Sequence, residues 1–268
     1  MATRVASTAA PPRGDAVAAV GLLIGAAWLT VVVLEVTGHA ADLHHHTLIE
    51  GEDGAVPPPP WLSVALFLVA WQVMIAAMML PTSLRAVGVV ARSRYVGNPG
   101  AAVLGFLAAY SLAWTAYGFV AFLGDIGLHH LVDTTPWLAE RESLIGAASL
   151  ALAGTWQLIP LRRRALEACR HPSASRGTAR LADVSRSADV ASGFRVGLAH
   201  AADCLVCSWA LMLLMFAAGV ANLAWMAGLA VVMAYEALGR HGARFGMAVA
   251  LPLLALAGLA AAGIGLGL

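Results

Sequence analysis

Three side chains on one apolar stretch of the sequence have the types and spacing of a soft metal site. Cys204 and Cys207 are separated by two residues, and His200 stands four residues before Cys204. In an α-helix these offsets place all three side chains on one face. Met212 and Met215 follow on or beside that face. Thiolate and thioether ligands together favour Cu(I) over zinc, so the pattern predicts a buried Cu(I) site.

A carboxylate and further methionines extend the prediction. Asp203 lies in the same apolar stretch, where an ionisable side chain is costly unless it is paired, so it is a candidate ligand. Met74 and Met78 are one helical turn apart in an earlier apolar stretch, and Met226 lies in a later one. The alternative is ordinary packing, because Met and Cys often fill apolar cores. The same alternative covers the sixth apolar stretch, where Asn222, Met226, Met233 and Glu236 share a face.

Two further sets of ligand-type residues lie outside the apolar stretches. Cys169 follows an arginine run and precedes His171, and flanking positive charge favours a thiolate that could serve as an exit ligand. His44, His45 and His46 stand among carboxylates in an early loop, where imidazole and carboxylate suit a divalent ion such as copper, zinc or nickel. The alternative is a polar loop surface without a metal.

Composition indicates which elements must position these residues. Of 268 residues, 60% are hydrophobic and only 12% are charged, whereas soluble domains carry roughly a quarter charged residues. Several apolar runs reach the roughly 20 residues that a membrane-crossing helix needs. We therefore predict an all-α, polytopic transmembrane bundle of about seven spans, forming a single integral membrane domain over residues 1–268. The predicted spans are 16–37, 62–80, 101–124, 143–160, 196–217, 219–238 and 245–266.

The distribution of arginine predicts the orientation. All 16 basic residues are Arg, and all but Arg141 fall in the loops on one side of the predicted spans. Cytoplasmic loops carry the excess of positive residues, so the N-terminus is predicted to be cytoplasmic. The segment 161–195 then becomes a cytoplasmic loop, and the histidine-rich loop lies on the outer face. No cleavable signal is expected, and the first apolar run is interpreted as an uncleaved span.

The chain resembles a bacterial family of predicted metal-binding integral membrane proteins, a domain of unknown function whose members are described as membrane copper chaperones. The resemblance rests on three blocks: Met74 to Pro81, Gln157 to Pro172, and Cys204 to Met226. It implies copper handling in the bacterial plasma membrane and supply of a copper-dependent client enzyme. Ala165 and Ser208 stand where the family often has further cysteines, which shifts weight toward His200, Asp203 and the methionines.

Three functions therefore remain open. The first is a non-enzymatic copper chaperone, with a copper transporter as its close variant. The second is a membrane thiol–disulfide oxidoreductase that uses Cys204 and Cys207, although such enzymes usually have a second, outer cysteine pair. The third is an assembly subunit in which these residues only pack. The lipid bilayer is an expected partner and nucleic acid is not, while the sequence leaves the client, the direction of transfer and the oligomeric state open.

Overall fold

The computed structural model describes residues 14–39, 59–93, 96–141, 143–174, 189–217 and 222–264, and within these ranges the protein is helical with no strand. The predicted all-α class is confirmed. The helices are α1 (Asp15–Val36), α3 (Pro60–Met78), α4 (Leu80–Arg92), α5 (Pro99–Thr134), α6 (Pro136–Ala139), α7 (Ser143–Leu158), α8 (Pro160–Arg170), the short 3₁₀ turn η2 (Pro172–Ala174), α10 (Asp189–Ala217), α11 (Leu223–Leu238) and α12 (Gly242–Ala261).

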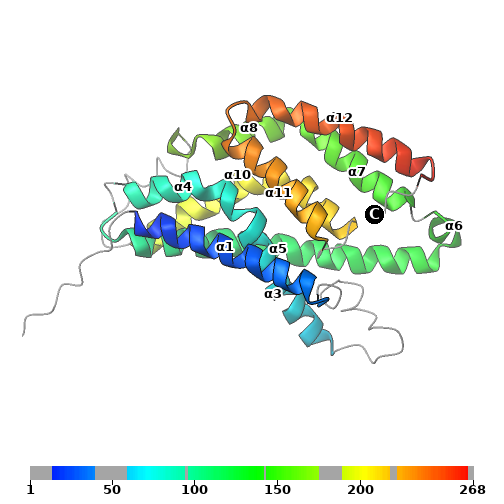
Figure 1. Cartoon of the computed structure of the whole chain (residues 1–268), viewed down its shortest axis with the longest axis horizontal. Helices are drawn as coiled ribbons and strands as arrows, with labels where there is room; N and C mark the ends of the chain where they lie inside the picture. Colours follow the sequence, from blue (N-terminus) through cyan, green and yellow to red (C-terminus); the bar gives the residue numbers. More distant parts are fainter. Residues whose placement is uncertain are drawn as a thin grey trace, which may run out of the picture.

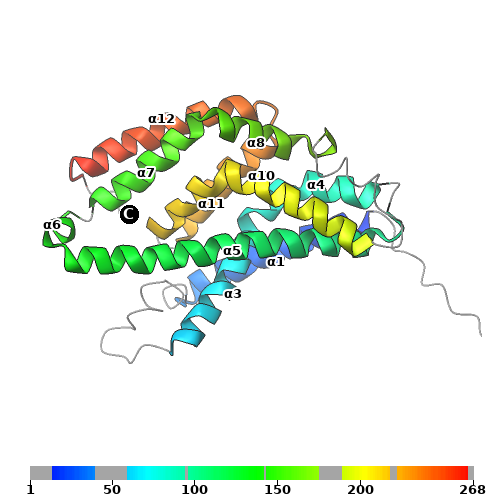
Figure 2. The same ribbon diagram turned by 180° about the vertical axis from the view of Figure 1, so that it is seen from behind.

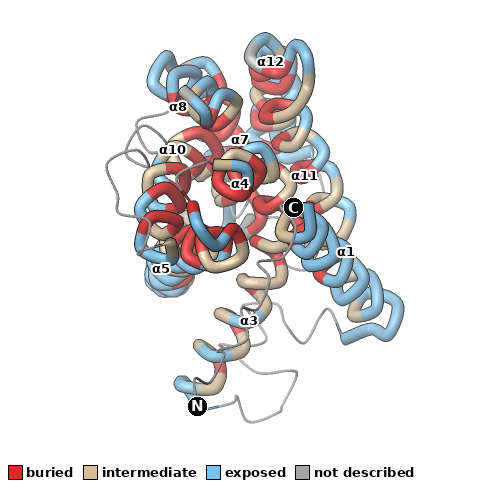
Figure 3. The backbone as a smooth tube through the Cα atoms, turned by 90° about the vertical axis from the view of Figure 1, so that its left-hand side faces the viewer, coloured by how far each residue is buried: buried red, intermediate tan, exposed pale blue. Residues whose placement is uncertain are grey.

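Helix α10, which carries Cys204 and Cys207, lies in the middle of the bundle. It runs along α5 on one side and contacts α7 and α8 on another. Helices α7 and α12 form a second long pair, as Figures 1 and 2 show from opposite sides. In the end view of Figure 3, buried backbone gathers around α10 and α4, whereas α1 is mostly exposed. The chemistry-bearing helix is therefore shielded by its neighbours.

Small residues allow α10 to approach α5 closely. A Cβ atom on Gly193 would overlap the backbone of Ala102, and one on Gly197 would overlap the backbone of Phe106. On the facing helix, a Cβ atom on Gly105 would overlap the backbone of Val190. Glycines four residues apart are a common way for apolar helices to bring their backbones together. This contact fixes α10 against the side chains of α5.

Prolines lie at the breaks that separate α7 from α8 and α3 from α4. Pro160 holds Ile159 in an extended conformation, and α8 leaves α7 at an angle of 69°. Pro81 lies at the start of α4, directly after the break at Met79. Because Pro81 has no N–H, the carbonyl of Ala77 is available to another donor, and the indole of Trp28 donates to it at 3.0 Å. The predicted span 62–80 therefore ends in a break rather than in a straight helix.

The segment 161–195, predicted to be a loop, is helical at both ends. Its first part is α8, and α10 begins at Asp189. In α8 the buried residues are Arg162, Ala165, Leu166 and Cys169, which recur at helical spacing, while Arg163 and Arg164 are exposed. This stripe packs α8 against the bundle. The arginine run conceals it in the sequence, because Arg162 is itself one of the buried residues.

Arginines from two other segments cap the C-terminal end of α11. Arg85 donates to the carbonyls of Ala237 at 3.1 Å and Leu238 at 2.7 Å. Arg170 donates to the carbonyl of Glu236 and, at 2.8 Å, to that of Gly239. The last carbonyls of a helix lack intrahelical donors and carry partial negative charge, which favours such cations. The arginine-bearing segments thus meet at one end of the molecule.

Five helices are long and apolar enough to cross a membrane, or six if α7 and α8 form one bent span. Helix α11 is a shorter apolar helix. All seven predicted spans fall largely on helices of the structure, although the hairpin expected near 218–220 lies outside the described residues. The span count of seven and the cytoplasmic N-terminus remain predictions.

Candidate metal centre

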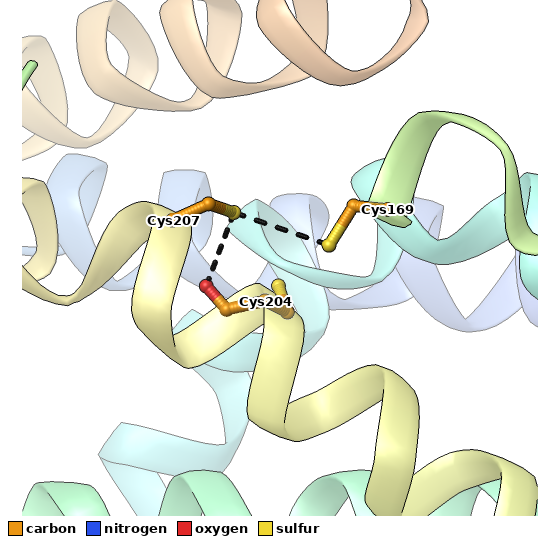
Figure 4. Close-up of side chains that lie close together, drawn as sticks. All are labelled: Cys169, Cys204 and Cys207. Carbon is orange, nitrogen blue, oxygen red and sulfur yellow. Dashed lines mark hydrogen bonds between the residues drawn. The ribbon is translucent and has the colours of Figure 1, made fainter. Parts of the chain in front are cut away.

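Cys204 and Cys207 lie on the same face of α10, as their spacing predicts. Both are buried, and the Cys207 thiol donates to the carbonyl of Cys204 at 3.2 Å. Figure 4 shows both side chains directed toward the space between α10 and α8. The helix alone therefore brings two thiols together.

Helix α8 brings the third thiol to the same place. The sulfur of Cys169 lies 4.0 Å from that of Cys207 (Figure 4), and the three cysteine sulfurs all lie within 4.8 Å of one another. Cys169 is 4% exposed, so it lies inside the protein rather than in a solvent-exposed loop. All three cysteines of the chain thus form one buried thiol cluster, defined here as Cys169, Cys204 and Cys207.

The spacing of the thiol cluster suits one metal ion. Three sulfurs arranged in a plane around an ion at the metal–thiolate distance of about 2.3 Å would stand about 4.0 Å apart. The Cys169–Cys207 separation of 4.0 Å matches that value. The cysteines are free in this structure, so the sulfurs are available as ligands. The cluster could therefore hold a soft ion.

Hydroxyl groups surround the Cys204 side of the cluster. The phenol of Tyr110 lies 3.1 Å from the Cys204 sulfur, the hydroxyl of Ser208 at 3.9 Å and that of Thr82 at 4.0 Å. The phenol and Thr82 also donate to the carbonyl of Met79, at 3.3 and 2.7 Å. The α3–α4 break thus presents a carbonyl that positions two hydroxyls against the thiol.

Sequence reasoning passed over Met79 and Tyr110. Met79 is fully buried, and its sulfur accepts from Ser208 at 3.8 Å, so it lies one side chain away from Cys204. A signal existed, since Met79 stands two residues before Pro81, where a helix break was foreseeable. Tyr110 had no comparable signal, because nothing in its own apolar stretch points to a partner on α10.

The predicted ligands His200 and Asp203 do not belong to the group of donor atoms that meets within 4.8 Å. The His200 ring is buried between Phe106 and Tyr110 and lies 3.2 Å from the hydroxyl of Ser83. Asp203 is only partly buried. Their roles as ligands remain predictions.

The predicted methionine ligands are all buried in the contiguous core, with exposed fractions of 0 to 2%. They are Met74, Met78, Met212, Met215 and Met226. Their burial fits both metal binding and ordinary packing, so their role stays a prediction. Asn222, expected to bond a neighbouring helix in the packing alternative, instead caps its own helix by accepting from the backbone N–H of Trp225 at 3.2 Å.

The predicted outer capture site cannot be placed, since His44, His45 and His46 lie outside the described residues. A second imidazole that the predicted orientation places toward the outer face, His129, lies 3.6 Å from a carboxylate oxygen of Asp125, one turn away on α5. A single imidazole–carboxylate pair on one helix does not make a closed metal site.

A buried ion pair adjoins the Cys207 side of the cluster. Arg162 and Glu236 form a salt bridge at 1% and 2% exposure. The Arg162 Nε also donates to the carbonyl of Cys207 at 3.2 Å. Arg162 and Cys169 lie two turns apart on α8, so the ion pair ties the Cys169-bearing helix to α10 and α11. It therefore helps to set the distance between Cys169 and the other two thiols.

A family model described as PpoB2, copper chaperone, matches residues 68–260, which extend from α3 into α12 and include all three cysteines. No curated protein and no solved structure matches the chain. Because the matched region covers well over half of the 268 residues and contains the whole thiol cluster, the chain belongs to the PpoB2 copper chaperone family.

Proposed function

We propose that this protein is a membrane copper chaperone that holds Cu(I) as cargo between the thiolates of Cys169, Cys204 and Cys207. The observation that carries the proposal is the convergence of three buried sulfurs, within 4.8 Å of one another, from two helices. Thiolates are soft ligands and select Cu(I), zinc and iron–sulfur clusters. The family favours copper among these.

The surroundings of the thiol cluster support storage and release rather than redox catalysis. Cys204 has hydroxyl neighbours whose protons can turn from the carbonyls of Met79 and Cys204 to a thiolate, which would stabilise the bound sulfur without competing for the ion. Cys169 lies near the end of α8, close to the arginine-capped end of α11, so it is the thiol we expect to pass the ion onward. His171 and the core methionines would serve as transient ligands in that exchange.

The apolar helices support a location in the bacterial plasma membrane. Large side chains such as Leu22, Leu104, Val231 and Leu251 are 66 to 76% exposed, which would face lipid in a membrane. The arginine distribution supports an orientation with the N-terminus and α8 on the cytoplasmic side. In this orientation the histidines at 44–46 would collect copper on the outer face, and a copper-dependent client would receive it.

The test is the copper content of the protein purified in detergent under reducing conditions. We expect about one copper per chain in the wild type and a strong loss of copper in each of Cys169→Ser, Cys204→Ser and Cys207→Ser. Each substitution removes one of the three sulfur ligands, and the hard serine oxygen does not replace a soft thiolate. Met247→Leu is the matched control, since it removes an exposed sulfur that is 49% accessible.

Two outcomes would contradict the proposal. A wild-type protein that stays metal-free after Cu(I) loading would exclude the copper-binding function and favour the oxidoreductase or the assembly subunit. Copper binding that depends on Cys204 and Cys207 but not on Cys169 would show that the structure's third sulfur is not a ligand.

A further inference from the structure

Four helices bring a second set of buried polar groups together next to the thiol cluster. Gln157 of α7, Arg162 of α8 and Glu236 of α11 are 1 to 2% exposed. All three side chains reach toward Gly246 of α12. We call Gln157, Arg162 and Glu236 the polar cradle.

Only part of the hydrogen-bonding capacity of the polar cradle is used. Arg162 Nη2 pairs with Glu236 Oε2, and Arg162 Nε donates to the Cys207 carbonyl. Four other buried atoms of the polar cradle have no hydrogen-bond partner among the described residues: Gln157 Nε2, Gln157 Oε1, Arg162 Nη1 and Glu236 Oε1. Burying such atoms unpaired is costly, so four together need an explanation.

Three of these four atoms converge on Gly246 of α12. A Cβ atom on Gly246 would lie 2.8 Å from Arg162 Nη1, 3.4 Å from Gln157 Oε1 and 3.5 Å from Glu236 Oε1. Three of the four atoms therefore border the position that a side chain would occupy. Only glycine fits here without a shift of the guanidinium, so the three atoms lie against the backbone of α12.

The chemistry of the four atoms selects their partner. Gln157 Nε2 and Arg162 Nη1 are donors, whereas Gln157 Oε1 and Glu236 Oε1 are acceptors. A cation would meet the Arg162 guanidinium, and an anion would meet the Glu236 carboxylate. A neutral molecule that accepts two hydrogen bonds and donates two satisfies all four atoms, and water does so.

We propose that the polar cradle binds one structural water molecule beside Gly246. The water accepts from Gln157 and Arg162 and donates to Gln157 and Glu236. It joins α7 to the ion pair between α8 and α11, and so holds Arg162 with its Nε on the carbonyl of Cys207. This site belongs to the metal-free protein and stands whether or not copper is the cargo.

The sign of one stability change tests the proposal. In Gln157→Leu, the water loses two of its four partners, so the unfolding temperature in detergent should fall by a few degrees. If the Gln157 amide is instead unpaired, replacing it by an apolar side chain should raise the unfolding temperature. An increase or no change overturns the proposal. Gln72→Leu is the reference variant. The Gln72 amide hydrogen-bonds directly to Ser111 and Thr115, so the fall in its unfolding temperature measures the cost of removing an amide whose partners are protein groups.

A second variant keeps the test independent of leucine packing. Gly246→Ala places a methyl group 2.8 Å from Arg162 Nη1 and so displaces the guanidinium from the water, whereas Gly258→Ala on the same helix meets open space. Gly246→Ala should lower the unfolding temperature, and Gly258→Ala should not. Combining Gly246→Ala with Gln157→Leu should cost less than the sum of the two, because both remove the same water. Additive costs, or a wild-type density map that resolves other ordered waters but none here, would overturn the site.

Discussion

Two buried polar clusters meet at Cys207, and they differ in what burial costs them. The thiol cluster consists of three free cysteines, and a buried free cysteine behaves as a small apolar group. The polar cradle contains a guanidinium and a carboxylate at 1% and 2% exposure, whose burial is expensive unless each keeps its partner. The comparison indicates that the polar cradle has the larger effect on stability, whereas the thiol cluster is the site at which we propose that the ion is held.

The largest change in stability should follow from removing the charged partner of Arg162 in the polar cradle. Glu236→Leu leaves Arg162 buried without its counter-ion, and we expect a loss of about 3–5 kcal/mol in the free energy of unfolding. The measurement is unfolding by a denaturing detergent, followed by circular dichroism. Glu167→Leu is the control, because Glu167 pairs with His171 on the surface and such pairs contribute about 0–1 kcal/mol. Equal losses in the two variants would contradict a structural role for the cradle.

By contrast, each Cys→Ser substitution described above should remove copper while changing the metal-free stability little. A protein in which Cys207→Ser unfolds as readily as Glu236→Leu would show that the two clusters are not separable.

A moderate effect should come from the hydroxyl group nearest the thiol cluster. Tyr110→Phe removes a phenol hydroxyl that lies 3.1 Å from the Cys204 sulfur. Tyr117→Phe is the matched variant and removes a hydroxyl that donates to the Trp209 carbonyl at 2.8 Å. Both should lose about 1 kcal/mol of stability. Only Tyr110→Phe should weaken Cu(I) binding, by up to about tenfold, because its phenol can donate to a thiolate. Competition with a Cu(I) chelator measures this, and equal affinities in the two variants would exclude a role for Tyr110.

The smallest effect should distinguish the methionines. The Met79 sulfur accepts from Ser208 at 3.8 Å, and the Ser208 hydroxyl lies 3.9 Å from the Cys204 sulfur, so Met79 is linked to the thiol cluster through Ser208. Met79→Leu should therefore lower Cu(I) affinity by about threefold, and Met247→Leu should leave it unchanged. A tenfold or greater loss would instead make Met79 a direct ligand.

Much of the fold followed from the lengths of the apolar stretches. The predicted spans 16–37, 143–160 and 245–266 correspond closely to α1, α7 and α12. Helix α8 was hidden, because a buried arginine in its apolar stripe resembles one more charge in a basic loop. Its burial depends on Glu236, a residue 74 positions later in the chain, and no local pattern reports such a partner.

The sequence by itself determined that Cys204 and Cys207 lie side by side, because the geometry of a helix places residues three apart on one face. It also determined that these thiols stand in an apolar helix beside methionines. The packing of the bundle decided that Cys169, rather than His200 or Asp203, completes the group within 4.8 Å. That choice depends on the 69° bend before Pro160 and on the ion pair that holds α8 in place. Contacts within one turn are set by covalent geometry, whereas contacts across a chain reversal are set by the packing of the whole bundle.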